Sequence, residues 1–370
     1  MQTVLKYLRY GLPLAYLGYA VAANAWVFLN HGQLDTAPAG RLLDGTAAAG
    51  FEKAYSRAMP HREPAISLIG ATRYALVGEG RPGVVVGRNG WLFTAEELAI
   101  ADAAGIAEAI THIVAARDLL AYRGTDLVLV PIPAKTDIHR DVLLMDEAAV
   151  AMEAQYRAFV AAVDTADVKL VDTRAALAAP GARAQAFLRT DTHWSPTGAQ
   201  VVAKAVATSG HIAPGNQALA AHPDGPQGFW GDLVSYVTSD ALAPTLGLSR
   251  EQVVPYVAIA SGSDPETSIF ADATPATDIV LVGTSYSANR RWSFVPALQI
   301  ALQRDILNYA AEGQGPAPPM QAFLESDAFR AEPPKVVIWE VPIRYLGAAD
   351  TWAVTWQGPL LTELGDSNSG

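Results

Sequence analysis

The sequence predicts an α/β fold whose mostly parallel sheet is flanked by helices and preceded by an N-terminal transmembrane helix. From about residue 40 onward, short β-branched runs alternate with longer alanine-rich segments of helical character. One of these runs, residues 125–133, is almost wholly apolar, which is typical of a strand covered by helices on both faces. A third observation is a stretch near the start, Tyr10–Leu34, that contains no Asp, Glu, Lys or Arg and predicts the membrane-spanning segment.

The composition excludes several classes of function. The chain has 370 residues, of which 51% are hydrophobic and 17% charged, enough for one large domain or two small ones. A formal net charge of -11 argues against binding of nucleic acid through bulk electrostatics. The chain has no cysteine, which excludes zinc-thiolate sites, iron-sulfur clusters and thiol nucleophiles. We therefore predict no nucleic-acid partner and no thiolate-bound metal, and we expect no cofactor.

The uncharged stretch is long enough to cross a membrane, since a spanning helix takes roughly 20 apolar residues. Lys6 and Arg9 precede it and Asp35 follows it, so the positive-inside tendency places the N-terminus in the cytoplasm and the rest of the chain outside. We predict that residues 1–34 form a cytoplasmic stub and an uncleaved signal anchor, and that residues 35–370 form one exported domain.

A cleaved signal peptide is the alternative, because Ala23, Asn24 and Ala25 have the small-x-small pattern of a cleavage site. The length of the apolar run favours the anchor, because it exceeds the ~7 to 15 residues of a signal-peptide core. Both alternatives export the domain.

The expected elements of the domain follow in order. Gly124 predicts the end of the first long helix, because glycine is favoured just past a helix C-terminus. Residues 209–270 are richer in Pro, Gly, Ser and Asp, and we expect an insertion there that serves as a lid or substrate-binding wall. The elements are a strand, a turn at Arg88-Asn89-Gly90 and a strand within 83–93, helices at 95–124 and about 145–165, and strands at 125–133, 168–173, 277–287 and 334–346.

The first candidate for a site is a serine that follows a predicted strand, because ligands of open α/β sheets bind beyond the carboxyl ends of the strands. One strand ends at Gly283, and Ser285 follows two positions later, where a tight turn would present its hydroxyl. The surrounding sequence resembles a nucleophile elbow, although Ser287 stands where that motif has its second glycine. The alternative is that the hydroxyls of Thr284, Ser285 and Ser287 only cap a helix.

A serine nucleophile needs a base, and His193 is distinguished among the seven histidines by Asp191 and by a helix start at Ser195-Pro196. A carboxylate two residues before an imidazole can accept its Nδ1–H when the turn is tight, which leaves Nε2 free to deprotonate Ser285. A loop hydrogen bond and a metal site are the alternatives. No other histidine or acidic pair has matching local spacing, so we predict no metal.

The third candidate site follows the last predicted strand, where Glu340, Arg344 and Tyr345 lie close together in sequence. Arg344 would bind a substrate carboxylate or pair with Glu340, and Tyr345 would donate a hydrogen bond to an oxyanion. A structural pair of glutamate and arginine beside a packed tyrosine is the alternative.

Six short motifs occur in one order and carry a resemblance to a known family. The Asp-Thr-His-Trp element and the Gly-Thr-Ser-Tyr-Ser element are the most specific, and each motif alone is weak. Together they resemble the periplasmic polysaccharide O-acetyltransferases of the AlgJ and AlgX type, including cellulose-acetylating homologues, over roughly residues 80–346. The motifs are GRNGWLF (87–93), VPIPAK (130–135), TDTHWSPTGA (190–199), GDL (231–233), VGTSYS (282–287) and VIWEVPIRYL (337–346).

The resemblance implies an SGNH-hydrolase-like domain in which Ser285 is the nucleophile, His193 the base and Asp191 the acid that orients the base. It implies a two-step transfer, through an acetyl-serine, to a hydroxyl of an exported polysaccharide such as alginate or cellulose. It also implies a periplasmic location at the inner membrane, a membrane-bound O-acyltransferase partner of the MBOAT type that delivers acetyl groups, and other polysaccharide export subunits.

Further residues are expected to bind substrate or to stabilise the oxyanion. Trp194 or Trp230 would stack on a sugar ring, and an acidic polymer would favour a groove with cationic residues. A secreted carbohydrate acetylesterase of the same fold and a non-catalytic, anchored glycan-binding subunit of an export complex are the alternatives for the function. The remaining candidates are Thr284, Tyr345 and the cationic side chains of Lys135, Arg290, Arg291 and Arg344.

Overall fold

The computed structural model describes residues 2–30, 44–261 and 278–356. The chain folds into two compact units, of which the first joins Met1–Gly78 with Val237–Leu246. The second joins Glu79–Tyr236 with Gly247–Gly370. The domain boundary predicted at residue 34 lies outside the described residues, as do residues 262–270 of the predicted insertion.

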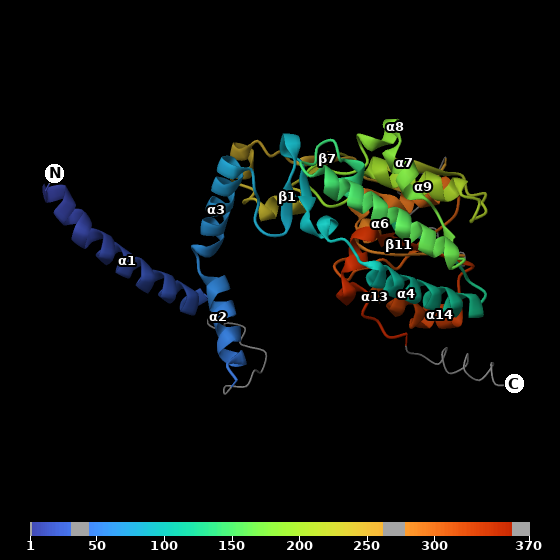
Figure 1. Ribbon diagram of the computed structural model, residues 1–370, viewed down its shortest axis with the longest axis horizontal. Helices are drawn as coiled ribbons and strands as arrows, with labels where there is room; N and C mark the ends of the chain where they lie inside the picture. The colour runs from blue at the N-terminus through green and yellow to red at the C-terminus, as the bar shows by residue number, and fades with distance from the viewer. Residues whose placement is uncertain (1, 31–43, 262–277, 357–370) are drawn as a thin grey trace. The chain divides into compact units, whose positions relative to one another are not determined.

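A five-stranded parallel sheet is the centre of the second unit (Figure 1). The strands β3 and β11 pair along their whole length, with Val128 opposite Ile338. Every neighbouring pair in this sheet is parallel, which confirms the predicted α/β class. The strand order is β10 (Leu307–Asn308), β9 (Ile279–Val282), β11 (Val336–Pro342), β3 (Asp126–Ile132) and β4 (Lys169–Leu170).

Helices cover both faces of the sheet because its strands are apolar on both. Successive residues of a strand point to opposite faces, so Leu127 and Leu129 of β3 belong to one hydrophobic cluster, and Val128 and Val130 belong to another. The first cluster is closed by α4 (Ala103–Tyr122), α6 (Asp146–Thr165), α13 (Ala317–Leu324) and α14 (Asp327–Ala331). The second cluster is closed by α7 (Thr173–Ala178), α9 (Pro196–Thr208) and α12 (Phe294–Leu302).

Most predicted elements form, but several of their ends differ from the prediction. The helix predicted from residue 95 starts only at Ala103, because Oδ1 of Asp102 accepts a hydrogen bond from Gly105 N–H at 2.8 Å and caps the helix there. The predicted hairpin is confirmed as β1 (Val84–Val86) and β2 (Leu92–Thr94) around the turn η1 (Arg88–Gly90), and it is followed by the short turn η2 (Ala95–Leu98). The strands predicted at 168–173, 277–287 and 334–346 are shorter and end at Leu170, Val282 and Pro342.

The segment after α9 forms two small antiparallel pairs. β5 (Leu219–Pro223) pairs with β8 (Tyr256–Ala260), and β6 (Gln227–Phe229) pairs with β7 (Glu251–Val253). The role of this insertion as a lid or substrate-binding wall stays a prediction. The short helical turns are α5 (Lys135–Ile138), α8 (Pro180–Arg183), α11 (Ser285–Ala288), η3 (Asp232–Tyr236), η4 (Ala243–Leu246), η5 (Arg290–Trp292), η6 (Ile343–Gly347) and η7 (Ala349–Thr351).

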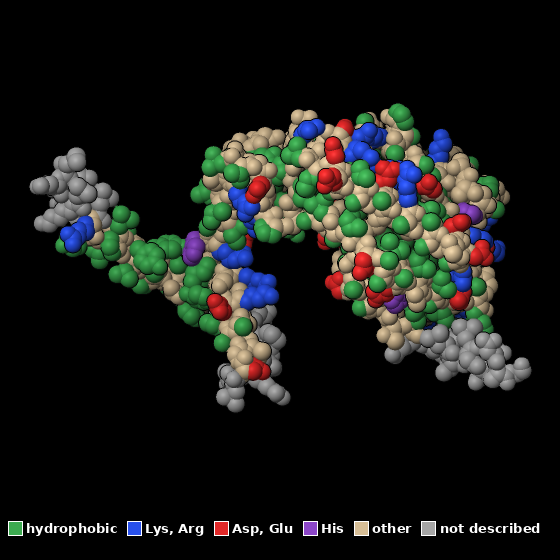
Figure 2. Space-filling model, viewed as in Figure 1, with side chains coloured by type: hydrophobic (Ala, Val, Ile, Leu, Met, Phe, Trp, Pro, Cys, Tyr) green, Lys and Arg blue, Asp and Glu red, His purple; other side chains and the backbone are tan. Residues whose placement is uncertain are grey.

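Three helices make up most of the first unit: α1 (Gln2–Asn30), α2 (Thr46–Ala58) and α3 (Arg62–Val77). In α1, Arg9–Asn30 is long and apolar enough, by length and composition, to cross a membrane. Figure 2 shows apolar side chains along this helix, and most of the large ones are exposed. Within the same unit, the hydroxyl of Thr238 donates to the carbonyl of Ser67 at 3.0 Å, which joins the returning segment 237–246 to α3.

Candidate active site

A tight turn after β9 carries Ser285, and only glycine fits at its start. A Cβ atom on Gly283 would lie 2.5 Å from Oε2 of Glu340 and 2.9 Å from its Cβ, so a side chain there would displace Glu340. Thr284 then caps α11, with its hydroxyl accepting from Tyr286 N–H at 3.4 Å. The expected helix cap therefore exists, and it leaves the hydroxyl of Ser285 available to another partner.

The structure brings Ser285, His193 and Asp191 together. Nε2 of His193 lies 2.7 Å from Oγ of Ser285, and Nδ1 of His193 lies 2.8 Å from Oδ1 of Asp191. An ionised carboxylate can only accept, so Nδ1 carries the proton and the lone pair of Nε2 faces the serine hydroxyl. Only 13% of the His193 side chain is exposed. Burial alone would raise the pKa of Asp191, but the hydrogen bonds and charge of His193 outweigh it and lower that pKa, which keeps the carboxylate ionised.

Aromatic side chains fix the orientation of the His193 ring. The ring of Trp292 stacks against it at 5.1 Å between centroids and 21° between planes, and Tyr286 contacts it at 4.9 Å. The hydroxyl of Tyr286 donates to the carbonyl of Thr192 at 3.0 Å, which ties the loop that carries His193 to α11.

Trp194 is completely buried and donates its indole N–H to the carbonyl of Tyr286 at 3.1 Å. The expectation that Trp194 stacks on a sugar is therefore wrong, because no face of its ring reaches solvent.

Lys135 is a buried structural residue and does not line a groove, which corrects the sequence-based expectation. Its ammonium group donates to the carbonyls of Leu92 at 2.6 Å, Arg189 at 3.1 Å and Asp191 at 2.9 Å. Burial lowers its pKa to about 8, while carboxylates around it, first that of Glu97, favour the charged form. Lys135 thus ties β2 to the loop that carries Asp191 and has no donor left for a substrate.

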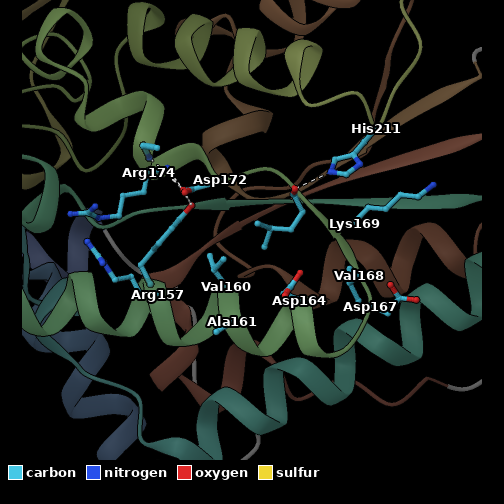
Figure 3. A pocket seen from close by; sticks show the side chains of 13 residues that line it. Arg157, Val160, Ala161, Asp164, Asp167, Val168, Lys169, Asp172, Arg174 and His211 are labelled. Atoms are coloured by element: carbon cyan, nitrogen blue, oxygen red, sulfur yellow. Dashed lines mark hydrogen bonds between the residues drawn. The ribbon is translucent and has the colours of Figure 1, made fainter.

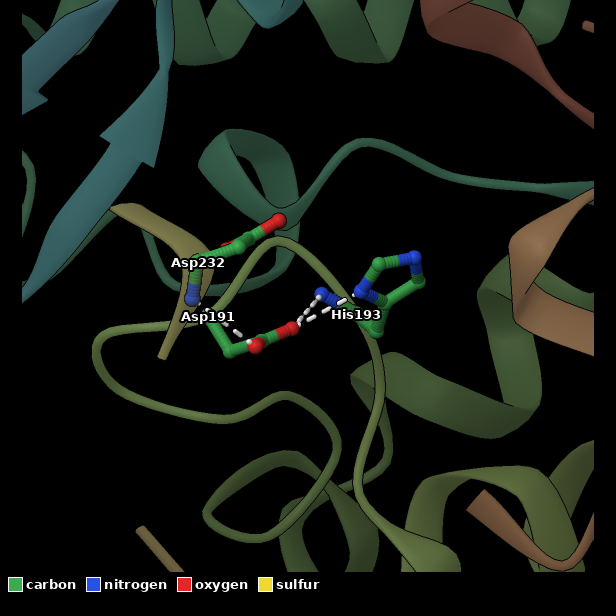
Figure 4. A group of neighbouring side chains, drawn as sticks. All are labelled: Asp191, His193 and Asp232. Atoms are coloured by element: carbon green, nitrogen blue, oxygen red, sulfur yellow. Dashed lines mark hydrogen bonds and ion pairs between the residues drawn. The ribbon is translucent and has the colours of Figure 1, made fainter. Parts of the chain in front are cut away.

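Asp232 is a member of this site that the sequence did not identify, although it lies in the GDL motif. Its Oδ1 accepts from Thr192 N–H at 2.8 Å, and its own N–H donates to Oδ2 of Asp191 at 3.1 Å (Figure 4). A Cβ on the preceding Gly231 would lie 2.2 Å from the carbonyl oxygen of Thr190, so the two loops touch through their backbones. Although the residue as a whole is exposed, desolvation of its carboxyl group, reinforced by the charge of Asp191, raises the pKa of Asp232.

The carboxylates of Asp191 and Asp232 and the imidazole of His193 each have a potential metal-ligand atom within 4.8 Å of the others. Three of the four carboxylate oxygens accept hydrogen bonds, since His193 donates to Oδ1 of Asp191, Asp232 N–H donates to Oδ2 of Asp191, and Thr192 N–H donates to Oδ1 of Asp232. These hydrogen bonds orient both carboxylates, and none of them depends on a cation. The absence of a metal from the reaction stays a prediction.

Glu340 lies directly under the turn that carries Ser285. It is completely buried, and its Oε2 accepts from Thr284 N–H at 2.8 Å and from the hydroxyl of Ser287 at 2.9 Å. Its Oε1 accepts from the hydroxyl of Thr284 at 3.1 Å, so this hydroxyl is not free for a substrate, contrary to the expectation for Thr284. Burial raises the pKa of Glu340 to about 7. Glu340 therefore fixes the turn and does not form the expected ion pair with Arg344.

Comparison with known proteins places this architecture in one family. Residues 84–343 match the family described as an SGNH hydrolase-like domain, acetyltransferase AlgX. The chain belongs to this family. The SGNH-like fold and the class of enzyme, an O-acetyltransferase, are thereby confirmed.

Several proteins of this acetyltransferase family cover most of the chain. The probable alginate O-acetylase AlgJ of Pseudomonas syringae pv. tomato is 36% identical, over 90% of this chain and 87% of the relative. The protein of the same description from Azotobacter vinelandii is also 36% identical, over 90% and 88%. Among solved structures, the O-acetyltransferase domain of Pseudomonas putida AlgJ is 36% identical with a TM-score of 0.63, covering 72% of this chain and 93% of that one. Pseudomonas aeruginosa AlgX is 25% identical with a TM-score of 0.57, covering 75% and 67%.

Arg344 of this acetyltransferase domain lies beside the aromatic side chains of the site. It is 6% exposed, and its guanidinium lies over the rings of Tyr286 at 5.3 Å and Tyr345 at 4.8 Å. Nη2 donates to the hydroxyl of Tyr345 at 2.9 Å, and Nε lies 3.4 Å from Oε2 of Glu96, which is its ion-pair partner in place of Glu340. Nη1 is buried and has no hydrogen-bond partner within the described part of the chain. Buried polar groups normally have a hydrogen-bond partner, so this N–H group lacks one that the described residues do not supply.

A separate cavity of about 760 Å³ lies against α6 and β4 and shares no residue with the serine site (Figure 3). His211 contacts the carbonyl of Leu170 there at 3.0 Å. The cationic side chains of its lining, Arg157, Lys169 and Arg174, each pair with a carboxylate. The lining also includes Asp164, Asp167 and Asp172, so its three paired cations do not form a receptor for an anionic ligand.

Proposed function

We propose that this chain transfers acetyl groups to hydroxyls of exported alginate in the periplasm, through an acetyl-serine at Ser285. The observation that carries the proposal is the hydrogen-bonded series from Asp191 through His193 to Ser285, at 2.8 and 2.7 Å. The relatives described as probable alginate O-acetylases support alginate, a polymer of uronic acids, as the acceptor.

In the first half-reaction, Ser285 becomes acetylated. Nε2 of His193 takes the proton of the serine hydroxyl while Oγ attacks the acetyl carbonyl of the donor. The bond between the acetyl group and the donor oxygen then breaks, and His193 returns the proton to that leaving oxygen. Asp191 stabilises the imidazolium during both steps because its carboxylate faces Nδ1.

In the second half-reaction, a sugar hydroxyl replaces the donor. His193 takes its proton, the sugar oxygen attacks the acetyl carbonyl, the bond to Oγ breaks, and the proton returns to Ser285. Arg344 and Tyr345 are the proposed stabilisers of the negative oxygen, since Nη1 of Arg344 has no hydrogen-bond partner among the described residues. The hydroxyl of Tyr345 accepts from Arg344, which leaves its own proton free to donate.

The proposed setting is the periplasmic face of the inner membrane. The apolar helix at Arg9–Asn30 would anchor the domain, and relatives described as alginate biosynthesis protein AlgX support a place among export subunits. We propose that a membrane-bound O-acyltransferase delivers the acetyl groups, because a reaction that consumes activated acetyl groups outside the cytoplasm needs a route across the membrane.

The decisive experiment follows the acetyl group. Wild type and Ser285→Ala are incubated with a chromogenic acetyl ester, and their peptides are examined by mass spectrometry before and after addition of an alginate oligosaccharide. We expect one acetyl group on the peptide that contains Ser285, its loss when the oligosaccharide is added, and an acetylated sugar product. Equal acetylation of the Ala variant would refute the serine mechanism, and transfer to water alone would favour the acetylesterase alternative.

A further inference from the structure

Arg291 presents a guanidinium group that no carboxylate of the described residues pairs with. Its Cζ lies over the ring of Phe229 at 4.1 Å from the centroid, and the side chain is partly exposed. Its backbone N–H donates to Oδ1 of Asn289 at 3.0 Å, which fixes the start of η5. The guanidinium is thus held by an aromatic face and by a capped turn, and its partly exposed charge has no ion-pair partner among the residues that the structure describes.

A continuous series of aromatic contacts joins this guanidinium to the catalytic imidazole. Phe229 packs against Trp292 at 5.8 Å between centroids, and Trp292 stacks on His193 at 5.1 Å. Cζ of Arg291 also lies 5.8 Å from the ring centroid of Trp292. Only the side chain of Trp292 therefore lies between Arg291 and the imidazole of His193, and packing couples the positions of these two side chains.

A guanidinium that stacks on an aromatic ring keeps its N–H donors at its edges, where they suit the two oxygens of a carboxylate. Stacking also restricts the long side chain, so less conformational entropy is lost when a ligand binds. The chain carries a formal net charge of -11, so bulk electrostatics would repel an acidic polymer. An acidic acceptor therefore requires a local cation beside the site.

The other three cationic candidates from the sequence do not meet this requirement. Lys135 spends its three donors on backbone carbonyls, and Arg344 is buried with Glu96 as its partner. Arg290 is exposed and has no aromatic support among the contacts of the described residues. Arg291 alone of this group combines an open charge, a supporting ring and a connection to His193.

We propose that Arg291, supported by Phe229, binds a carboxylate of the acidic acceptor polysaccharide and so selects the sugar whose hydroxyl meets the acetyl group on Ser285. This inference rests on the proposed acetyl transfer and adds the recognition of a uronate. The carboxylate makes two parallel hydrogen bonds to the edge of the guanidinium, and no bond is made or broken in this step. Acceptors without a carboxylate lose this contact and depend on the remaining surface of the site.

The test compares Arg291→Ala with Arg290→Ala, which removes the same charge from the neighbouring position. Each full-length variant and the wild type acetylate two oligosaccharides of equal length, an oligouronate and its carboxyl-reduced, neutral form. For Arg291→Ala we expect kcat/KM with the oligouronate to fall about 10- to 100-fold. This is the loss expected when a charge-assisted hydrogen bond that contributes roughly 1.5 to 3 kcal/mol is removed. With the neutral acceptor, kcat/KM of Arg291→Ala should fall less than about fivefold. Arg290→Ala should lose less than about fivefold in kcat/KM with either oligosaccharide, as for an exposed surface charge.

The pattern of losses decides the inference. Equal losses for both acceptors, or equal losses for the two arginine variants, would overturn it, because the effect would then be structural or a matter of net charge. Arg291→Lys adds a check, since it keeps the charge but not the paired donors and should recover only part of the oligouronate activity. Hydrolysis of a chromogenic acetyl ester without acceptor tests the proposed function separately. If the wild type hydrolyses the ester no faster than Ser285→Ala does, the serine mechanism is refuted. If Arg291→Ala transfers acetyl groups to the oligouronate as fast as the wild type does, only the carboxylate site is refuted.

Discussion

The two oxygens of Asp191 serve different donors, and this division defines the site at the scale of single residues. Oδ1 accepts from the ring and the backbone of His193, and Oδ2 accepts from the N–H of Asp232. The carboxylate of Asp191 therefore fixes the tautomer of the His193 imidazole and also binds the backbone of the loop that carries Asp232. Neither role requires the aspartate to exchange a proton.

Asp191→Asn is expected to reduce kcat for ester hydrolysis by about 10³- to 10⁴-fold, because the amide would favour the wrong tautomer of the His193 imidazole. An amide has one acceptor oxygen, so either His193 Nδ1–H or Asp232 N–H would face an N–H donor. Asp232→Asn is the matched control, because its remaining oxygen can still accept from Thr192 N–H and it makes no hydrogen bond to His193. Similar losses in both variants, with folding intact by circular dichroism, would contradict the assignment of Asp191 as the orienting acid.

Glu340→Gln is expected to change how stability depends on pH. The folded-state pKa of Glu340 is about 7, raised by burial from an ordinary value of 4.5, so the folded protein holds this proton more tightly than the unfolded chain. Its contribution to stability is therefore complete below about pH 4.5 and declines as the pH rises to about 7. Glutamine cannot ionise, so thermal unfolding midpoints of the variant relative to wild type should rise across that interval. Parallel curves for the two proteins would show that Glu340 does not titrate there.

Sequence spacing identified the residues whose partners are local or lie at a strand end. Asp191 and His193 are two positions apart, and Ser285 directly follows a strand, so chain order alone suggested them. Asp232 and the role of Glu340 depend on contacts with residues 41 and 56 positions away, which no local pattern contains. The expectation that Lys135 lines a substrate groove was wrong for the same reason. The local sequence around a lysine that follows a strand does not show whether its side chain faces solvent or backbone carbonyls.

At the scale of elements, caps and close backbone contacts decide where helices lie. Apolar periodicity located the helices and strands, but Asp102 and Thr284, through their side-chain caps, set the starts of α4 and α11. The start of α9 is set by Ser195, whose hydroxyl accepts from Gly198 N–H at 3.0 Å. This helix directly follows His193, so its packing positions the base.

Gly198→Ala tests that packing. A Cβ on Gly198 would lie 2.0 Å from the carbonyl oxygen of Ala186 and 2.9 Å from its carbonyl carbon, and both are backbone atoms that cannot rotate away. We expect a loss of about 1 to 3 kcal/mol in unfolding free energy, typical of overpacking, and a lower rate of ester hydrolysis as His193 shifts. Gly181→Ala in α8 is the control, because no atom lies within 4 Å of a Cβ there. Denaturant unfolding of both variants decides, and equal stabilities would contradict the close contact.

At the scale of the whole molecule, the first unit is discontinuous in sequence. Val237–Leu246 leaves the insertion of the acetyltransferase unit and joins α3 of the unit that begins with α1. The sequence predicted one exported domain after residue 34 and gave no sign of this return, because a ten-residue segment without helical or strand periodicity carries no pattern that would show its partner. The apolar pattern of α1, in contrast, is complete within its own residues and was predicted from them.

The fate of α1 decides whether the enzyme stays anchored to a membrane or is released from it. Arg9–Asn30 has 22 residues and matches the roughly 20 that span a bilayer, so we expect the chain to remain uncleaved and anchored. Intact mass spectrometry of the protein from the native host, or from a Gram-negative expression strain, should give the full chain, and the protein should sediment with membranes until detergent is added. A chain that starts at Asp44, which keeps α2 and α3, should be recovered in the soluble fraction. A mature N-terminus at Trp26, just after Ala23-Asn24-Ala25, would show instead that the apolar segment is a signal peptide.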